Sequence, residues 1–339
     1  MASDSKAEQP TQGGGPWVRY RVEYRDNATG ELISELYAQN QKESLEQEES
    51  RDHHHVVMDE PIFELMTIYQ ARRSVGSTRG ESSVSFLTMS HTMHLTIYSP
   101  AIINALQSVV KYYPSQDLSG NPLTINYPYA VLAHHYDELD AFRETCATKA
   151  PDKMCAREEH ASEHLALLIK FLDNSIMKDV RLEMERNKEG IMTWEYAWVG
   201  YKPGATRVQR FRGDKDYNAS VVHSVSGGIF DSPPTVWNVK TWSLQFDGSL
   251  VGTKTQVFEQ GKFDGESYEN NEVYMSTEDF LEAVETKSLS EQGFKKIEYG
   301  KAWWKLLTKQ CKHYKGKTRD YPHNEVSHGK QASRNMHYS

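Results

Sequence analysis

The first hundred residues alternate between bulky and polar side chains in several short runs. Residues 17–24 (WVRYRVEY) change character at every second position, which is the period of a half-buried β-strand. A turn signal at 27–30 (NATG) separates this run from residues 31–37, so the two runs predict the strands of a hairpin. Residues 62–69 and 86–98 are rich in β-branched and aromatic side chains and predict two further strands.

Helical spacing replaces this alternation after Tyr98. Ser99 and Pro100 predict a helix start, because proline is favoured at the first helical position. Apolar residues at intervals of three and four then predict a helix over 129–145 and a longer one over 155–185.

Alternation returns beyond position 204. A strand at 236–246, the turn signal Asp247-Gly248 and a return over 250–263 predict a β-hairpin. The remaining elements predicted in this part are strands at 207–211 and 220–225 and helices at 277–287 and 288–309.

Residues 190–204 (GIMTWEYAWVGYKPG) join the longest helical pattern to this second β-rich region. They place Trp194, Tyr196, Trp198 and Tyr201 within eight positions, and the Pro203-Gly204 pair closes the segment with a turn signal. Large aromatic side chains supply much buried area. We therefore expect Trp194 and Trp198 to anchor the long helix against the β-rich region, rather than to take part in catalysis.

These patterns predict an α+β protein in which a helical half packs on an antiparallel β region. Polar runs without periodicity predict disordered termini and an acidic insertion that is disordered or forms a solvated helix. The predicted segments are a disordered lead (1–16), a β-rich segment (17–98) with its insertion (39–55), a helical segment (99–189), a β-rich region with closing helices (190–312) and a basic tail (313–339).

Charge is spread unevenly along the 339 residues. Positions 295–339 hold eleven Lys and Arg against three acidic residues, a net charge of +8; since the whole chain carries −8, the remainder carries −16. Three cysteines (Cys146, Cys155 and Cys311) form no dense framework, which fits a reducing compartment. Neither a signal peptide nor an apolar run long enough for a membrane span is visible. We expect a cytoplasmic protein, with the nucleus as the alternative, and no membrane partner.

The sharpest enzymatic pattern is His160-Ala-Ser-Glu163-His164. This H-x-x-E-H spacing places both imidazoles on one helical face, as in inverted zinc peptidases, and Glu163 could activate a water. A zinc peptidase would need a third ligand, for which Glu189 and Glu195 are nominees. The competing interpretation is the polar start of an amphipathic helix, and it is favoured: we expect no catalytic residue, no cofactor and no metal.

Other candidate sites are weaker. Gly316-Lys317-Thr318 lacks the upstream glycine of a P-loop, because Cys311 stands at that position. His91 and His94 are three apart on a predicted strand and so face opposite sides. The run at 53–55 (HHH) lies in a polar tract, and Trp303-Trp304 fits a helix core better than nucleic-acid stacking, so no nucleic-acid partner is expected.

Several segments together resemble the uncharacterised N-terminal domain that precedes the ATPase module in large AAA-type ATPases of filamentous fungi. The resemblance covers roughly 85–320 and rests on the order and spacing of its parts. These parts are 97–106 with 112–114, Pro128-Tyr129 with 132–139, Trp194, Trp198, Pro203 and Gly204, Phe246-Asp247-Gly248 with Gly252, Phe263-Asp264-Gly265, Phe294, and Tyr314 with Gly316.

The resemblance implies an accessory domain that binds a protein partner or substrate without catalysis. The ATPase module does not follow, so hydrolysis is not carried over, and the chain is expected to be a stand-alone copy of the domain or the product of a truncated gene model. A full-length AAA-type ATPase is the candidate partner. Oligomeric state is left open.

Overall fold

The computed structural model describes residues 18–38, 61–73, 86–150, 154–210, 217–246 and 250–268, together with a few isolated positions. The predicted lead, acidic insertion and basic tail lie outside these residues, as do the 53–55 run, Asp247-Gly248, Cys311, Tyr314 and Gly316. Most of the two predicted closing helices, including Phe294 and Trp303-Trp304, also lies outside them.

The first sheet has the strand order β2-β1-β3-β4-β5. The predicted hairpin is confirmed, because β1 and β2 pair antiparallel. On its other side β1 pairs with β3, and this pairing is parallel. Asp26 fixes the hairpin turn, where its carboxylate accepts hydrogen bonds from the backbone N–H groups of Ala28 and Thr29. The strands are β1 (Val18–Asp26), β2 (Leu32–Ala38), β3 (Phe63–Arg73), β4 (Phe86–Ile97) and β5 (Leu123–Asn126).

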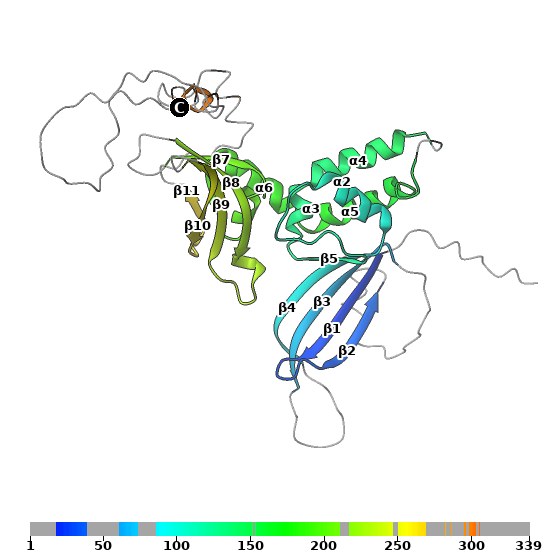
Figure 1. The fold of residues 1–339 in the computed structure, drawn as a ribbon. Coiled ribbons are helices and arrows are strands. Elements are labelled where there is room, and N and C mark those ends of the chain that lie inside the picture. The colour runs from blue at the N-terminus through cyan, green and yellow to red at the C-terminus, as the bar shows by residue number, and fades with distance from the viewer. Residues whose placement is uncertain are drawn as a thin grey trace, which may run out of the picture.

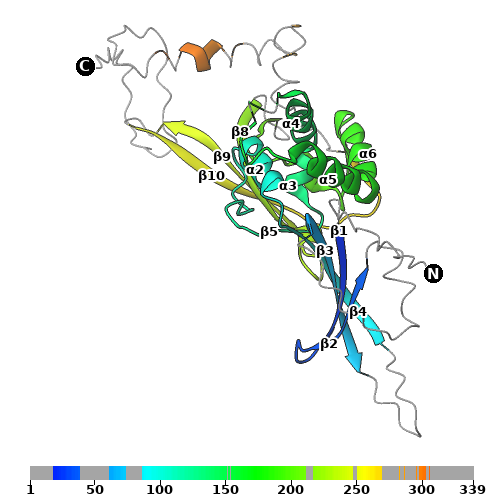
Figure 2. The ribbon, with the colours of Figure 1, turned by 90° about the vertical axis from the view of Figure 1, so that its right-hand side faces the viewer.

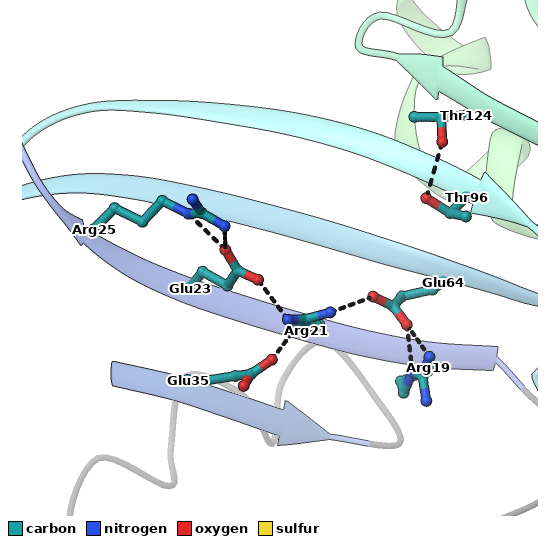
Figure 3. A network of polar contacts seen from close by, with 8 residues as sticks. All are labelled: Arg19, Arg21, Glu23, Arg25, Glu35, Glu64, Thr96 and Thr124. Atoms are coloured by element: carbon teal, nitrogen blue, oxygen red, sulfur yellow. Dashed lines mark hydrogen bonds and ion pairs between the residues drawn. The ribbon is translucent and has the colours of Figure 1, made fainter. Parts of the chain in front are cut away.

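One face of this sheet carries a network of charged side chains (Figure 3). Alternation along β1 places its arginines on that face, next to two carboxylates, Glu23 and Glu64, that are only 2% and 1% exposed. Such buried carboxylates need paired cations. The network pairs Arg25 with Glu23 at 2.7 Å, Arg21 with Glu23 at 2.6 Å, Arg21 with Glu35, and Arg19 with Glu64. Three arginines balance three glutamates, so the network is neutral within itself.

The helices gather at one end of the first sheet (Figures 1 and 2). Ser99 caps the first of them, because its hydroxyl accepts a hydrogen bond from the Ile102 N–H. Pro100 lies in the first turn, and the helix begins where the sequence predicted. The helices are α2 (Pro100–Val109), α3 (Ala130–His134), α4 (Tyr136–Thr148), α5 (Ala161–Ser175) and α6 (Met177–Lys188).

Two predicted helices are each divided in the structure. The helix predicted over 129–145 breaks at His135, and the one predicted over 155–185 starts only at Ala161 and breaks at Ile176. The break at Ile176 leaves the apolar stripe intact, since Leu172, Ile176 and Val180 are all buried in one core. Periodicity alone therefore could not locate it.

The second sheet is antiparallel throughout and has the strand order β10-β9-β8-β7. Its β9–β10 pairing confirms the predicted hairpin. A separate pair joins β6 to β11. The elements are β6 (Ile191–Thr193), η3 (Ala197–Gly200), β7 (Thr206–Arg210), β8 (Tyr217–Gly227), η4 (Gly228–Phe230), β9 (Trp237–Phe246), β10 (Val251–Gln260) and β11 (Glu266–Tyr268).

The protein is α+β, as expected: helices and mostly antiparallel sheets occupy separate parts of the molecule (Figure 1). One main core cluster runs from β3 to β5 of the first sheet through α2, α3, α5 and α6 to η3, β8 and β9. Within the described residues, no helix is long and apolar enough to cross a membrane.

Candidate functional site

The 190–204 segment lies where the helices meet the second sheet. Gly190 and Gly204 adopt positive φ values of 73° and 87°, the left-handed conformation that glycine favours, and they mark its two ends. Between them Trp198 is fully buried, and Trp194 and Tyr201 are nearly so. The Gly204 N–H donates to the Val222 carbonyl at 2.8 Å, which attaches the end of the segment to β8.

A buried carboxylate attaches the start of the segment to α6. Glu183 is 0% exposed, and its side chain accepts from the Thr193 N–H at 2.7 Å and from the Thr193 hydroxyl at 2.9 Å. Arg186, one turn later, lies 3.3 Å from the same carboxylate and 3.1 Å from Glu266 of β11. The end of α6 is thus joined by polar contacts to both strands of the small β6–β11 sheet.

The two tryptophans of the segment act through both their rings and their carbonyls. The Trp194 carbonyl accepts from the Trp237 indole N–H at 2.7 Å, and the Trp198 carbonyl accepts from His134 Nε2 at 3.1 Å. The Trp198 ring lies 5.4 Å from His134 and 6.3 Å from Phe230, measured between ring centroids. These contacts join the segment to α3 and to β9. The helix that they reach is α3, so the anchoring of the predicted long helix by the two tryptophans stays a prediction.

A cavity of about 260 Å³ opens beside this anchor. Several aromatic residues line it, together with residues of the β5–α3 turn and of the β8–η4 turn. The aromatic residues and histidine of its lining are Tyr113, Tyr127, His134, Trp198, Tyr201 and Phe230.

His134 is the central polar group of the cavity wall. A carbonyl can only accept, so His134 Nε2 donates to Trp198, and Nδ1 of the neutral ring then accepts from the Tyr113 hydroxyl at 3.1 Å. Burial lowers the pKa of His134 to about 3, and burial raises the pKa of Tyr113 well above its usual value. Near pH 7 neither group exchanges protons readily, so the pair suits neutral hydrogen bonding rather than general acid–base catalysis.

A second, more open hollow of about 690 Å³ is lined by Trp194, by residues of α6 and by residues between β10 and β11. Tyr196 and Phe263 contribute to it, and the Lys262 ammonium lies 5.6 Å from the centre of the Trp194 ring. Glu195, one of the nominated zinc ligands, lines this hollow.

The H-x-x-E-H residues are placed at the start of α5. His160 precedes the helix with a φ of 61°, and its ring stacks on that of His164 at 5.6 Å with planes 17° apart. Imidazole ligands bind a metal in the plane of each ring, and two nearly parallel planes do not converge on one nearby ion. His164 Nδ1 is also 2.8 Å from the Ser99 hydroxyl, and Glu163 is exposed. Among the described residues no group of three or more His, Cys, Asp or Glu could hold a metal ion.

The remaining titratable candidates do not converge either. Cys146 is buried, where burial raises its pKa, whereas Cys155 is exposed, and neither forms a disulfide. His91 pairs with Tyr69 and His94 with Met66 across the β3–β4 ladder, on opposite faces of the sheet.

The β9–β10 hairpin presents several exposed apolar side chains on one face, which we call the apolar stripe although Lys240, Thr253 and Thr255 lie on the same face. Sequence reasoning did not single it out. The strand register of the hairpin places Leu244, Val251 and Val257 on one face, with exposed fractions of 55%, 38% and 58%. The half-buried Trp242 lies on the same face, because it pairs with Thr255. The opposite face of β9 contributes Val239 and Thr241, which are buried. The alternation had predicted the strand, but not which face would stay uncovered.

A comparison with protein families matches the part of the chain that runs from the end of α6 to β11. A family described as a domain of unknown function (DUF7025) matches residues 183–268, about a quarter of the chain. That description names neither an activity nor an ATPase. Searches of curated proteins and of solved structures returned no match.

The matched residues begin at Glu183 and end at Tyr268, and their two ends meet in space. Tyr268 of β11 pairs with Ile191 of β6, and Glu183 binds Thr193 at the end of β6. The 190–204 segment, the second hollow and the exposed hairpin all belong to this unit. The end of α6 belongs to it too, although the sequence placed the boundary between segments at 189–190.

Proposed function

We propose that this chain is a non-catalytic binding module that recognises a protein partner through the β9–β10 hairpin. The observation that carries the proposal is the apolar stripe of Leu244, Val251 and Val257 beside an edge strand. Exposed apolar patches of this kind typically mark interaction sites.

The strand β10 suits addition of a further strand. It forms one edge of the second sheet, and among the described strands only β9 pairs with it. Natural proteins usually protect such edges with proline, bulges or many charges. The β10 sequence VGTKTQVFEQ has no proline and two charged residues, Lys254 and Glu259. An extended partner segment could therefore form main-chain hydrogen bonds along β10 and pack alternate side chains against the stripe.

The state of the titratable groups supports a role without catalysis. His134 is held neutral by burial, and its two ring nitrogens are used by Tyr113 and Trp198. The buried carboxylates Glu64 and Glu183 are paired with arginines. Each of these groups stabilises a contact between elements, which is a structural task.

The partner that we propose is a full-length AAA-type ATPase, and the module would regulate it or bring substrates to it. This assignment rests on the resemblance of roughly 85–320 to the domain that precedes the ATPase module in filamentous fungi. A domain fused to an ATPase in relatives is well placed to bind the same ATPase when it occurs as a separate chain.

Site-specific photocrosslinking tests this proposal. A photoreactive phenylalanine analogue at Val257, incorporated into the full chain in filamentous-fungal cells, should capture an AAA-type ATPase identified by mass spectrometry. The matched control places the analogue at Leu182 of α6, which is 51% exposed and lies outside the hairpin. Capture of the same ATPase from both positions, or of no protein from Val257, would contradict the proposed docking face. Specific capture of another protein would retain the face and overturn the ATPase assignment.

A further inference from the structure

The second hollow, of about 690 Å³, has an apolar wall that the described fold leaves partly uncovered. Tyr196, Ile229 and Phe263 line it and pack against the main core, but they are only half-buried. Leu182 of α6 lines it too and is 51% exposed. The volume lies within the usual range for ligand pockets, and these side chains are accessible from solvent. An aromatic or aliphatic side chain of an incoming segment can therefore pack there.

Three exposed carboxylates line the same hollow, those of Asp179, Glu195 and Asp264. None of them forms an ion pair with any residue that the structure describes. Asp179 accepts a hydrogen bond from the Tyr196 hydroxyl at 3.3 Å, which leaves its charge uncompensated. The apolar wall is thus bordered by negative charge that the described residues do not neutralise.

The two cations of the lining do not cancel this charge. Arg186 lies 3.3 Å from Glu183 and 3.1 Å from Glu266, so two further carboxylates already balance it. Lys262 is exposed, and its ammonium lies 5.6 Å from the centre of the Trp194 ring. With Glu183 and Glu266 included, five carboxylates stand against two cations. The hollow therefore favours a positively charged occupant.

Carboxylates elsewhere on the helices are less accessible to such an occupant. Several are already paired with a cation, at N···O distances between 2.6 and 2.8 Å. These pairs are Glu138 with Lys202, Asp140 with Arg143, Asp173 with Arg181 and Glu185 with Lys188. A basic segment would have to displace a cation at each of them, whereas the second hollow requires no displacement.

Residues 312–319 (KHYKGKTR) have the matching chemistry and lie outside the described residues. They include four Lys and Arg and no acidic residue, and Tyr314 stands among them. A tyrosine has an apolar ring and a polar tip, which suits a partly exposed apolar wall. We propose that this segment docks in the second hollow, with the Tyr314 ring on the apolar wall and the flanking cations beside Asp179, Glu195 and Asp264. This inference does not depend on the hairpin.

The covalent connection makes weak contacts sufficient for docking. A single surface ion pair contributes at most about 1 kcal/mol. A segment of the same chain, however, is present at an effective concentration on the order of millimolar, so several weak contacts together can hold it. The connection over 269–311 is long enough, because about 3.3 Å per extended residue gives a reach of more than about 100 Å.

Photocrosslinking within the full chain tests this docking. A photoreactive phenylalanine analogue in place of Tyr314 should form crosslinks, mapped by mass spectrometry, to residues 194–196 or 262–265. The control places the analogue at Tyr338, which has no cluster of cations beside it and should give a clearly lower yield at the same residues. Raising the salt concentration to 1 M should lower the Tyr314 yield several-fold, since the screening length is then only about 3 Å.

Charge reversal checks that the hollow is the docking site. Glu195→Lys/Asp264→Lys should lower the crosslink yield from position 314 at least about threefold, because each change replaces an attraction by a repulsion. Glu185→Lys/Glu189→Lys makes the same change in net charge at two exposed positions that do not line the hollow, so it should leave the yield unchanged. Chains labelled with heavy nitrogen, mixed with unlabelled chains, should give crosslinks within one chain only.

Several results would overturn the inference. Crosslinks from position 314 to other elements, or none at all, would exclude this site. An unchanged yield in Glu195→Lys/Asp264→Lys, with its melting temperature preserved, would exclude the acidic contacts, and a yield insensitive to salt would do so even if that variant folds poorly. Crosslinks between labelled and unlabelled chains would assign the hollow to a second copy instead.

Discussion

His134 Nε2 lies 3.1 Å from the carbonyl oxygen of Trp198, and this hydrogen bond joins helix α3 to the turn η3 across 64 positions of sequence. It holds the imidazole in one neutral tautomer and orients the Tyr113 hydroxyl at the other nitrogen. The same contact forms part of a cavity wall and part of the core. Its energetic consequences can be measured directly.

Because of His134, the free energy of unfolding should decrease as the pH is lowered. Its pKa is lowered from 6.5 to about 3 in the folded protein, so between these values the unfolded chain binds the extra proton. The contribution of His134 to the free energy of unfolding is therefore complete above pH 6.5. It is lost as the pH falls towards 3, at about 1.4 kcal/mol per pH unit. Urea unfolding at several pH values should show this slope. His134→Gln keeps a donor for Trp198 without titrating, so the difference between variant and parent isolates His134 from other acid-sensitive groups. Equal slopes would contradict the assignment.

Trp198→Ala should lower the free energy of unfolding by about 3–5 kcal/mol, the usual cost of truncating a core tryptophan. The residue is fully buried and contacts both His134 and Phe230. Trp242→Ala on the half-buried face of β9 serves as the comparison and should cost clearly less. A thermal midpoint that does not move in Trp198→Ala would argue against an anchoring role.

Gly228 should not tolerate a side chain. Its φ is +55°, and an added Cβ would lie 2.0 Å from the ring of Trp237, which is fully buried. We expect Gly228→Ala to destabilise the protein by about 3 kcal/mol or more, since overpacking adds to backbone strain. Gly190→Ala is the control, because Gly190 has a φ of +73° but no atom within 4 Å of the added Cβ. It should cost only about 1–2 kcal/mol for the conformation. Similar chemical unfolding midpoints for the two variants would show that the ring contact is unimportant.

Glu183→Ala should cost about 3 kcal/mol, because it leaves the Thr193 N–H and hydroxyl without their acceptor and removes one of the two carboxylates that Arg186 contacts. Glu185 provides a matched control two positions away on α6. Its side chain is 70% exposed and pairs with Lys188 at 2.8 Å, so Glu185→Ala should cost less than about 1 kcal/mol. Calorimetric melting of both variants distinguishes them, and equal losses would refute the structural role of Glu183.

The sequence predicted those features that depend on neighbouring residues. Alternation located β1, a high content of β-branched and aromatic residues located β4, Ser99-Pro100 located the start of α2, and the aromatic residues of 190–204 indicated a buried segment. The break at Ile176 was missed, because the apolar stripe continues through it. The two roles of Glu183 were also missed, since a glutamate within an amphipathic helix normally faces solvent.

The cavity could not have been predicted from periodicity. Tyr113, His134 and Trp198 come from three separated segments, and only the tertiary fold brings them together. The uncovered face of the hairpin is a similar case: the alternation of 236–246 is the same whether one face of β9 is exposed or covered. A signal was present in Leu244 and Val257, apolar residues at positions that a solvated strand face normally fills with polar ones.

The central claim, that the hairpin is a docking face for an AAA-type ATPase, is tested most directly by the affinity of the purified full chain for that ATPase. The double variant Leu244→Lys/Val257→Lys adds charge to the stripe at two exposed positions, and Leu182→Lys makes the same change on α6. Biolayer interferometry should show at least about a tenfold loss of affinity for the double variant, since burying an unpaired charge at an interface is unfavourable, and no change for Leu182→Lys. Parental affinity in the double variant, with its melting temperature preserved, would contradict the account.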